Sequence, residues 1–220
     1  MSIKNVLPMW VRYRIMDLRG RGVYSDFADE FQCIFIHIPK AAGTSVSRTL
    51  FNRGSRHVAY FEYEKANRRK FNQYFKFSFV RNPWDRLVST FFYLKRGGMV
   101  DMDKHWAEQN LAAFDDFESF VHNWVTEENV WSWVHFVPQH HFICDDKLNV
   151  KMDFVGRMEC IQSDFSHVAE KIDSPAQLVR TNVSSHDDYR DYYNAETKKI
   201  VADVYEKDIE LFGYQFDSGR

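Results

Sequence analysis

An apolar run that ends abruptly in a turn of small residues spans positions 33–45 of this chain. Four of its first six residues are Ile or Phe, which is typical of a buried strand in a mostly parallel sheet. Pro39 cannot extend the hydrogen-bond ladder of such a strand, and Gly43 allows the backbone to approach a ligand closely. Val46 and Leu50 then stand at helical spacing. We therefore predict a strand, a turn and a helix in direct succession.

The predicted helix start suits an anionic ligand. Thr44 and Ser45 carry hydroxyl groups at the positions where an N-cap belongs. A helix start offers unpaired backbone N–H groups and the positive end of the helix dipole, so a strand, a glycine turn and a helix together form a phosphate cradle. Lys40 adds a positive charge within the turn. We expect this segment to bind a phosphate or a related anion.

A second strand is predicted to run into a helix at residues 76–89. Asn82 is a favourable N-cap and Pro83 suits the first helical position. One face of this helix is apolar and consists of Trp84, Leu87, Val88 and Phe91. Arg81 would emerge at the carboxyl end of its strand, where open α/β sheets bind their ligands, and Ser89 follows two helical turns later.

Three further elements are predicted from local signals. Asp115 or Asp116 caps a short helix whose buried side comprises Phe117, Phe120, Val121 and Trp124. A strand is expected at residues 153–156, followed by a serine-capped helix at residues 163–172. Asn194 caps a final helix whose apolar face comprises Ile200, Val201, Val204, Tyr205 and Ile209.

Length and charge limit the organisation of the protein and its partners. A chain of 220 residues is sufficient for one α/β domain and short for two. We predict a peripheral N-terminal segment over residues 1–30 and a single domain over residues 31–220. The formal net charge of −2 gives no general attraction to nucleic acid or acidic membranes, so we expect neither as a partner. Any polyanion must bind through a local basic patch.

The spacing of the cysteines and histidines bears on the cellular compartment of the protein and on whether it binds a metal. Cys33, Cys144 and Cys160 are odd in number and lack metal-ligand spacing, which favours reduced thiols. No apolar segment approaches the ~18 residues of a membrane-spanning helix, and basic residues interrupt positions 1–16. We therefore expect a cytoplasmic protein. Residues 135–141 include three histidines without an accompanying carboxylate or cysteine pattern, so we expect no metal.

Two of these blocks together resemble the nucleotide-binding motifs of sulfotransferases. The first reads Pro39-Lys40-Ala41-Ala42-Gly43-Thr44-Ser45 and is similar to the loop that binds the 5′-phosphosulfate. The second, residues 77–89, is similar to the motif that binds the 3′-phosphate. Further similar blocks lie at residues 133–139, 153–159, 182–184 and 208–214, so the resemblance covers residues 31–214. The closest likeness is to Golgi-type carbohydrate sulfotransferases and their soluble bacterial relatives.

The resemblance implies a fold and a co-substrate. The fold is an α/β domain of the P-loop-like, three-layer type, in which helices flank a central, mostly parallel sheet. The co-substrate is 3′-phosphoadenosine 5′-phosphosulfate (PAPS), which leaves as adenosine 3′,5′-bisphosphate (PAP), and no metal is required. The residues implied in binding it are Pro39, Lys40, Ala42, Gly43, Thr44, Ser45, Arg81 and Ser89.

Lys40 and His57 are the implied catalytic residues. A lysine beside the bridging oxygen stabilises the charge that builds there when an acceptor hydroxyl displaces it. Residues 57–60 resemble the His-Val-Ser-Tyr-type segment that carries the catalytic base in uronyl 2-O-sulfotransferases, and an imidazole suits that task at neutral pH. From the residues alone, His57 opens a short strand beside the central one. The alternative bases are Glu62, Tyr63, Glu64 and the histidines of residues 135–141.

The acceptor is less constrained than the donor. The resemblance favours a carbohydrate hydroxyl, but a lipid, phenol or tyrosyl hydroxyl stays open because acceptor loops vary. The basic run within residues 65–70 reads as a solvated helix face or as part of a groove for an acidic glycan. The oligomeric state is not predicted.

Two other functions stay open. A phosphotransferase would carry Gly-x-x-x-x-Gly-Lys-Ser/Thr with its lysine after the glycines, whereas Lys40 precedes Gly43. A module that binds the nucleotide without turnover would keep the same fold, but the intact Lys40, Arg81 and Ser89 argue for catalysis. The phosphotransferase would bind ATP with Mg²⁺, whereas the binding module would bind the sulfate donor without consuming it.

Overall fold

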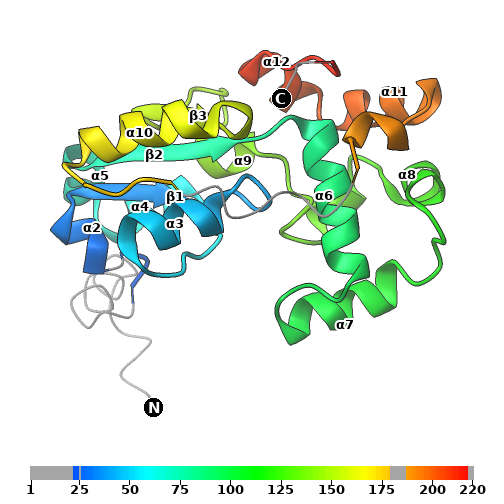
Figure 1. Ribbon diagram of the computed structural model, residues 1–220, viewed down its shortest axis with the longest axis horizontal. Helices are drawn as coiled ribbons and strands as arrows, with labels where there is room; N and C mark the ends of the chain where they lie inside the picture. The colour runs from blue at the N-terminus through cyan, green and yellow to red at the C-terminus, as the bar shows by residue number, and fades with distance from the viewer. Residues whose placement is uncertain (1–21, 25, 179–186, 218–220) are drawn as a thin grey trace.

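The computed structural model describes residues 22–24, 26–178 and 187–217. In this part of the chain, three parallel strands form one sheet in the order β1–β2–β3 (Figure 1). The strands are β1 (Cys33–Ile36), β2 (Phe75–Val80) and β3 (Phe154–Arg157). Ile36 pairs with Ser78 across β1 and β2, and Ser78 pairs with Val155 across β2 and β3. The predicted α/β class with a parallel central sheet is confirmed.

Helices flank this sheet. Figure 1 shows α10 on one side and α3 on the other. The helices of this half are α2 (Asp26–Glu30), α3 (Gly43–Phe51), α4 (Tyr60–Ala66), α5 (Arg68–Gln73), α9 (His140–Ile143) and α10 (Ile161–Lys171). Fully buried rings from the sheet and from α10, including Phe77, Phe79 and Phe165, form its hydrophobic core.

A second hydrophobic core lies in a helical half. Its longest helix, α6, starts directly after β2 and carries the chain away from the sheet, with α7, α8 and α11 around it (Figure 1). Phe91, Phe120 and Phe136 are fully buried at its centre. The helices here are α6 (Pro83–Lys95), α7 (Asp101–Asn110), α8 (Phe117–Trp124), α11 (Ala195–Val204) and α12 (Glu206–Phe212). Short 3₁₀ turns are η2 (Asn129–Trp131), η3 (Met158–Cys160) and η4 (Tyr189–Tyr192).

Three of the predicted polar helix caps are confirmed. The Asn82 side chain accepts a hydrogen bond from Trp84 N–H at the start of α6, and Pro83 is the first helical residue. Asp116 caps α8 in a capping box with Ser119. The Asn194 side chain accepts from the backbone N–H groups of the first turn of α11. These signals were readable because each cap acts within three residues of itself.

Three local predictions were wrong. The strand expected to begin at His57 is absent, because the chain stays irregular until α4 and then buries Tyr60 and Tyr63 on one helical face. The expected final helix is two helices, since α11 ends at Val204 and is followed by Tyr205, whose hydroxyl donates to Phe136 O. The expected serine cap is absent, because α10 begins at Ile161 without a side-chain cap.

Some predictions concern residues that the structure does not describe. Residues 1–21 lie outside the described residues, so the division into segments 1–30 and 31–220 stays a prediction; Tyr24 and Phe27 pack into the sheet core. The block at residues 182–184 also lies outside them. Within the described residues, no helix has the length and apolar character needed to span a bilayer.

Candidate active site

A cavity of about 1170 Å³ lies where β1 and β2 end. Its walls come from the loop after β1, the first turn of α3, the inner face of α6, the loop between α6 and α7, and residues 133–135. The positively charged residues along it are Lys40, Arg48, Arg56, Arg81 and Arg96, whereas Asp103 is the one carboxylate among the described lining residues. The cavity is therefore suited to a polyanion.

The loop after β1 has an unusual backbone. Lys40 and Ala42 adopt left-handed conformations with φ of 63° and 62°, which non-glycine residues rarely adopt. Gly43 is required for a different reason, because a Cβ atom there would lie 1.9 Å from Cδ2 of His37. The expectation that Gly43 allows the backbone to approach a ligand closely stays a prediction, since Gly43 also lines the cavity. The close neighbour is the imidazole of His37, and packing alone excludes a side chain.

The first turn of α3 faces the cavity without a side-chain cap. Its N-cap is Ala42, whose side chain makes no capping hydrogen bond. The prediction that a hydroxyl caps this helix was wrong, because Thr44 and Ser45 lie inside the first turn and line the cavity. Backbone N–H groups and the positive end of the helix dipole are therefore available to an anion.

Lys40 presents a partly buried ammonium group to the cavity. No hydrogen bond or ion pair joins its Nζ to the described residues; instead Nζ lies 4.2 Å from the centre of the Tyr93 ring. Burial, with Arg81 and Arg96 nearby, lowers the Lys40 pKa to about 8. A buried cation without a counter-charge is costly, so this group favours an anionic ligand.

Tyr93 is in turn fixed by Asp103. The Tyr93 hydroxyl donates to Asp103 Oδ2 (2.6 Å) and accepts from Met99 N–H (3.0 Å). Burial and this carboxylate raise the pKa of Tyr93. The Tyr93 ring, which contacts the Lys40 ammonium, is therefore held in place by the two hydrogen bonds of its hydroxyl.

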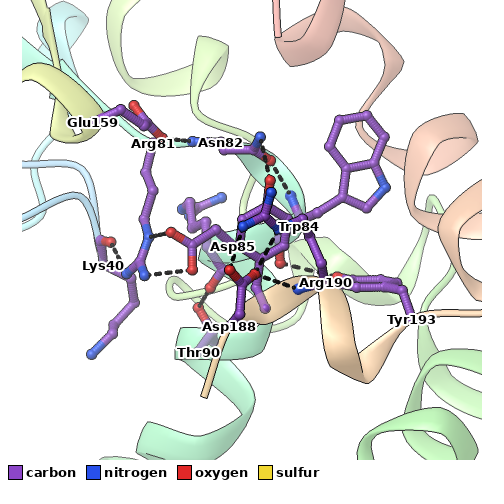
Figure 2. A network of polar contacts seen from close by, with 12 residues as sticks. Lys40, Arg81, Asn82, Trp84, Asp85, Thr90, Glu159, Asp188, Arg190 and Tyr193 are labelled. Atoms are coloured by element: carbon purple, nitrogen blue, oxygen red, sulfur yellow. Dashed lines mark hydrogen bonds and ion pairs between the residues drawn. The ribbon is translucent and has the colours of Figure 1, made fainter. Parts of the chain in front are cut away.

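Arg81 joins the ends of the two strands. It follows β2, and its Nε and Nη2 donate to Asp85 at 2.9 and 2.7 Å, while Nη1 donates to Lys40 O at 3.2 Å (Figure 2). Ser89 lines the same cavity and is buried, and its hydroxyl has no hydrogen-bond partner among the described residues. Because Asp85 engages the guanidinium fork, the role of Arg81 at a 3′-phosphate stays a prediction.

Arg86 is a structural residue that the sequence reasoning missed. Its guanidinium is buried and donates to Pro39 O (3.0 Å), His135 O (3.1 Å) and Val137 O (2.9 Å). It thereby ties the loop after β1 to residues 135–137 on the opposite wall. No local pattern marks it, because its partners lie more than 45 residues away.

Distant blocks of the sequence converge on the end of β2. Gln139 accepts from Arg81 N–H (2.9 Å) and donates to Arg81 O (2.8 Å) through its side-chain amide. Glu159 accepts from Asn82 N–H (2.6 Å; Figure 2), and Asp208 accepts from Gln139 N–H (2.6 Å). The blocks at 133–139, 153–159 and 208–214 thus fix the backbone that carries Arg81.

His57 has the geometry of a base. Its Nδ1 lies 3.0 Å from His37 O, and since a carbonyl only accepts, Nδ1 carries the proton and Nε2 keeps its lone pair. Burial lowers the His57 pKa below 6.5, and Arg86 and Lys40 nearby lower it further. The imidazole is thus neutral at physiological pH and able to take a proton.

A model of the sulfotransferase family matches residues 24–215 of the chain, which includes every element that lines the cavity. The chain belongs to the sulfotransferase family. An uncharacterized protein of the archaeon Archaeoglobus fulgidus is 34% identical over 130 residues, which are 57% of this chain and 91% of that protein. No solved structure matches the chain. Sulfotransferases of this family are enzymes that depend on PAPS as the sulfuryl donor.

The sulfotransferase brings most of its predicted site residues to one cavity. The lining includes Lys40, Ala42, Gly43, Thr44, Ser45, His57, Arg81 and Ser89. Pro39 is buried behind it, where its carbonyl accepts from Arg86. The roles of these residues toward a nucleotide stay predictions.

Among the alternative bases, only His135 lines the cavity of the sulfotransferase within the described residues. Glu62 and Glu64 lie near Lys65 and Arg68 in exposed ion pairs, and Tyr63 is in the sheet core. Burial lowers the pKa of His135 to about 3, and its Nδ1 lies 3.5 Å from Asp103 without a hydrogen bond. His57 therefore remains the predicted base.

Other predicted features lie away from the site. The basic run at residues 65–70 does not line the cavity, and Lys65, Arg68 and Lys70 pair with nearby carboxylates. His140 bonds to Asp208 instead of joining His135. Within the described residues, no group of three or more His, Cys, Asp or Glu side chains is arranged to hold a metal ion.

Proposed function

We propose that this sulfotransferase moves a sulfuryl group from PAPS to an acceptor hydroxyl on a carbohydrate by in-line displacement in the cavity described above. The observation that carries the proposal is the ammonium of Lys40, which has no ion pair with the described residues, on the same cavity as the first turn of α3, whose N-cap makes no side-chain hydrogen bond. Both groups need an anion, and a phosphosulfate supplies one negative charge to each.

The donor's two ends match two parts of the cavity. The backbone N–H groups of residues 42–44 and the hydroxyls of Thr44 and Ser45 hold the 5′-phosphate. Ser89, with its unpartnered hydroxyl, and Arg81 hold the 3′-phosphate. This second contact is what distinguishes PAPS from ATP.

The chemical step exchanges one S–O bond for another. The acceptor oxygen attacks sulfur while the bond from sulfur to the bridging oxygen breaks, and the departing electron pair leaves on PAP. Lys40 stabilises the negative charge that builds on the bridging oxygen. His57 Nε2 takes the proton of the acceptor hydroxyl, because its Nδ1 proton already bonds to His37 O.

Replacing Lys40 tests this function. We expect Lys40→Ala to lower kcat by about 10²–10³-fold, since it removes one charge-stabilising group from the transition state, while the affinity for PAP changes far less. PAP release from PAPS with a mixture of glycan acceptors measures turnover, and calorimetry measures affinity. Lys171→Ala, an exposed lysine at the end of α10, is the matched control. A Lys40→Ala protein with full turnover would remove Lys40 from catalysis.

A cytoplasmic location forms part of the proposal. Cys33, Cys144 and Cys160 are free thiols, and two of them are buried, as suits a reducing compartment. Fractionation of the source cells, followed by detection of the protein, checks this. Recovery from an extracytoplasmic fraction would contradict it.

A further inference from the structure

An exposed apolar cluster forms one edge of the active-site cavity. In the described part of the chain, five large apolar side chains are 40% or more exposed: Met99, Val100, Met102, Trp131 and Val150. Three of the five lie within residues 99–102, and these three line the cavity. We call Met99, Val100 and Met102 the apolar lip. Exposed apolar side chains that gather at a cavity mouth are a mark of a binding surface.

The lip is held in place by the same residues that hold the Lys40 ammonium. Met99 N–H donates to the hydroxyl of Tyr93, and Asp103 N–H donates to Val100 O (2.9 Å). Gly98 has a φ of 65°, and a Cβ atom there would lie 2.3 Å from Cβ of Asp103. The exposure of these side chains is thus imposed by a fixed backbone.

The lip lies on the side of the cavity that carries the base. The His135 ring centre is 5.1 Å from that of Tyr93, to which the lip is anchored, and 5.5 Å from that of His57. Trp133 stacks beyond His135 and lines the same wall. A group that rests on the lip is therefore a neighbour of the hydroxyl to be deprotonated.

The positive charge of the cavity matches the donor. PAPS carries about four negative charges at neutral pH, about two of them on its 3′-phosphate. Arg81 is already paired with Asp85, and the other cations of the described lining are Lys40, Arg48, Arg56 and Arg96. Asp103 offsets part of their charge. Bound donor therefore leaves no surplus of positive charge for an anionic acceptor.

We propose that the acceptor is an amphiphile, in which an apolar portion next to the sulfated hydroxyl rests on the lip of Met99, Val100 and Met102. This inference rests on the proposed sulfuryl transfer and specifies its substrate class. A sugar with an alkyl aglycone supplies both the hydroxyl and the apolar portion next to it, whereas a free acidic glycan lacks the apolar portion. Flexible methionine side chains suit an apolar group without a fixed shape.

Matched glucosides test the inference by binding rather than by turnover. We would titrate the protein, saturated with PAP, with methyl and octyl β-glucoside below the concentration at which the latter forms micelles. Since each fully buried methylene contributes about fourfold to affinity, we expect at least a ~10-fold tighter Kd for the octyl compound even with partial burial. Met99→Gln with Met102→Gln should reduce this ratio to less than ~3-fold, and each single variant should act in the same direction. Val150→Gln, at an exposed apolar position outside the cavity lining, should leave the ratio unchanged.

Four results would overturn the inference. They are equal Kd values for the two glucosides, a chain-length preference that survives the double variant, weaker PAP binding in the double variant, and a dimer that dissociates in it. Weaker PAP binding would show that the adenine covers the lip. Dissociation of a dimer would show that a second copy of the chain covers it. Failure of all variants and of the parent protein to bind PAP would contradict the sulfotransferase site instead, and titration of the nucleotide-free protein would still test the lip.

Discussion

The two sides of the cavity are built in different ways. On the donor side, backbone groups of residues 39–45 and 81–82 are fixed by buried side chains, among them Arg86 and Gln139. On the proposed acceptor side, exposed side chains on the loop after α6 and in the first turn of α7 line the cavity, and this segment is held mainly through Tyr93 and Asp103. The donor geometry thus depends on the folded core, whereas acceptor recognition depends on side chains that can change without unfolding the protein.

The largest expected effect isolates chemistry on the acceptor side. We expect His57→Ala to lower kcat by about 10²–10⁴-fold, because it removes the base, while the Kd for PAP stays within about twofold. Rapid-quench measurement of PAP formation gives the first value and calorimetry the second. His167→Ala, an exposed histidine on α10, is the control. If the His57→Ala variant retains sulfuryl transfer, the base is His135, and the roles that we assign to the acceptor side must change.

A substitution on the donor side should instead affect the whole molecule. Arg86→Met leaves Pro39 O and Val137 O without their donor and leaves His135 O only the long hydrogen bond from the Thr90 hydroxyl (3.4 Å), and buried unsatisfied carbonyls cost about 1–3 kcal/mol each. We expect a loss of about 3 kcal/mol or more in the free energy of unfolding, and a fall in Tm on the order of 10 °C. Thermal unfolding measures it, with the exposed Arg69→Met as control. A Tm equal to that of the control would mean that Arg86 does not hold the two walls together.

The pH profile of kcat/KM should have an acid limb set by His57 on the acceptor side and a basic limb set by Lys40 on the donor side. Below the lowered pKa of His57, its imidazole gains a proton and can no longer act as a base, so kcat/KM falls as the pH drops through that pKa, which lies below the ordinary histidine value. Above the Lys40 pKa of about 8, the ammonium loses its proton and its stabilising charge, so kcat/KM falls again.

Replacing Arg96 should have the smallest effect of these substitutions, and it tests most specifically whether Lys40 sets the basic limb. The Arg96 guanidinium lowers the pKa of Lys40, so Arg96→Ala should move the basic limb to higher pH and leave the acid limb in place. A pH profile of kcat/KM for both proteins measures this shift. A basic limb that stays fixed would assign it to a group other than Lys40.

Local signals predicted the donor side well. The strand, turn and helix around Gly43, and the Asn82 cap with Pro83, follow from residues within one helical turn of each other. Long-range contacts were beyond such patterns. Tyr93 and Asp103 meet only because α6 and α7 pack together, and Arg86 reaches across 51 residues to Val137.

The errors have the same origin. The segment after His57 is a short apolar run typical of a strand, but its tyrosines are buried as a helical face of α4, so tertiary packing overrode the local pattern. The apolar lip was also missed, since three apolar residues near a helix start look like core positions until their exposure is known.

The most direct test of the donor site is a calorimetric titration with PAP, in parallel with ATP plus Mg²⁺. We expect tight binding of PAP that does not depend on a metal, and much weaker binding of ATP, because Ser89 and Arg81 have a 3′-phosphate to bind only in PAP. Preference for ATP with Mg²⁺, or no binding of either nucleotide, would contradict the assignment of this cavity to PAPS.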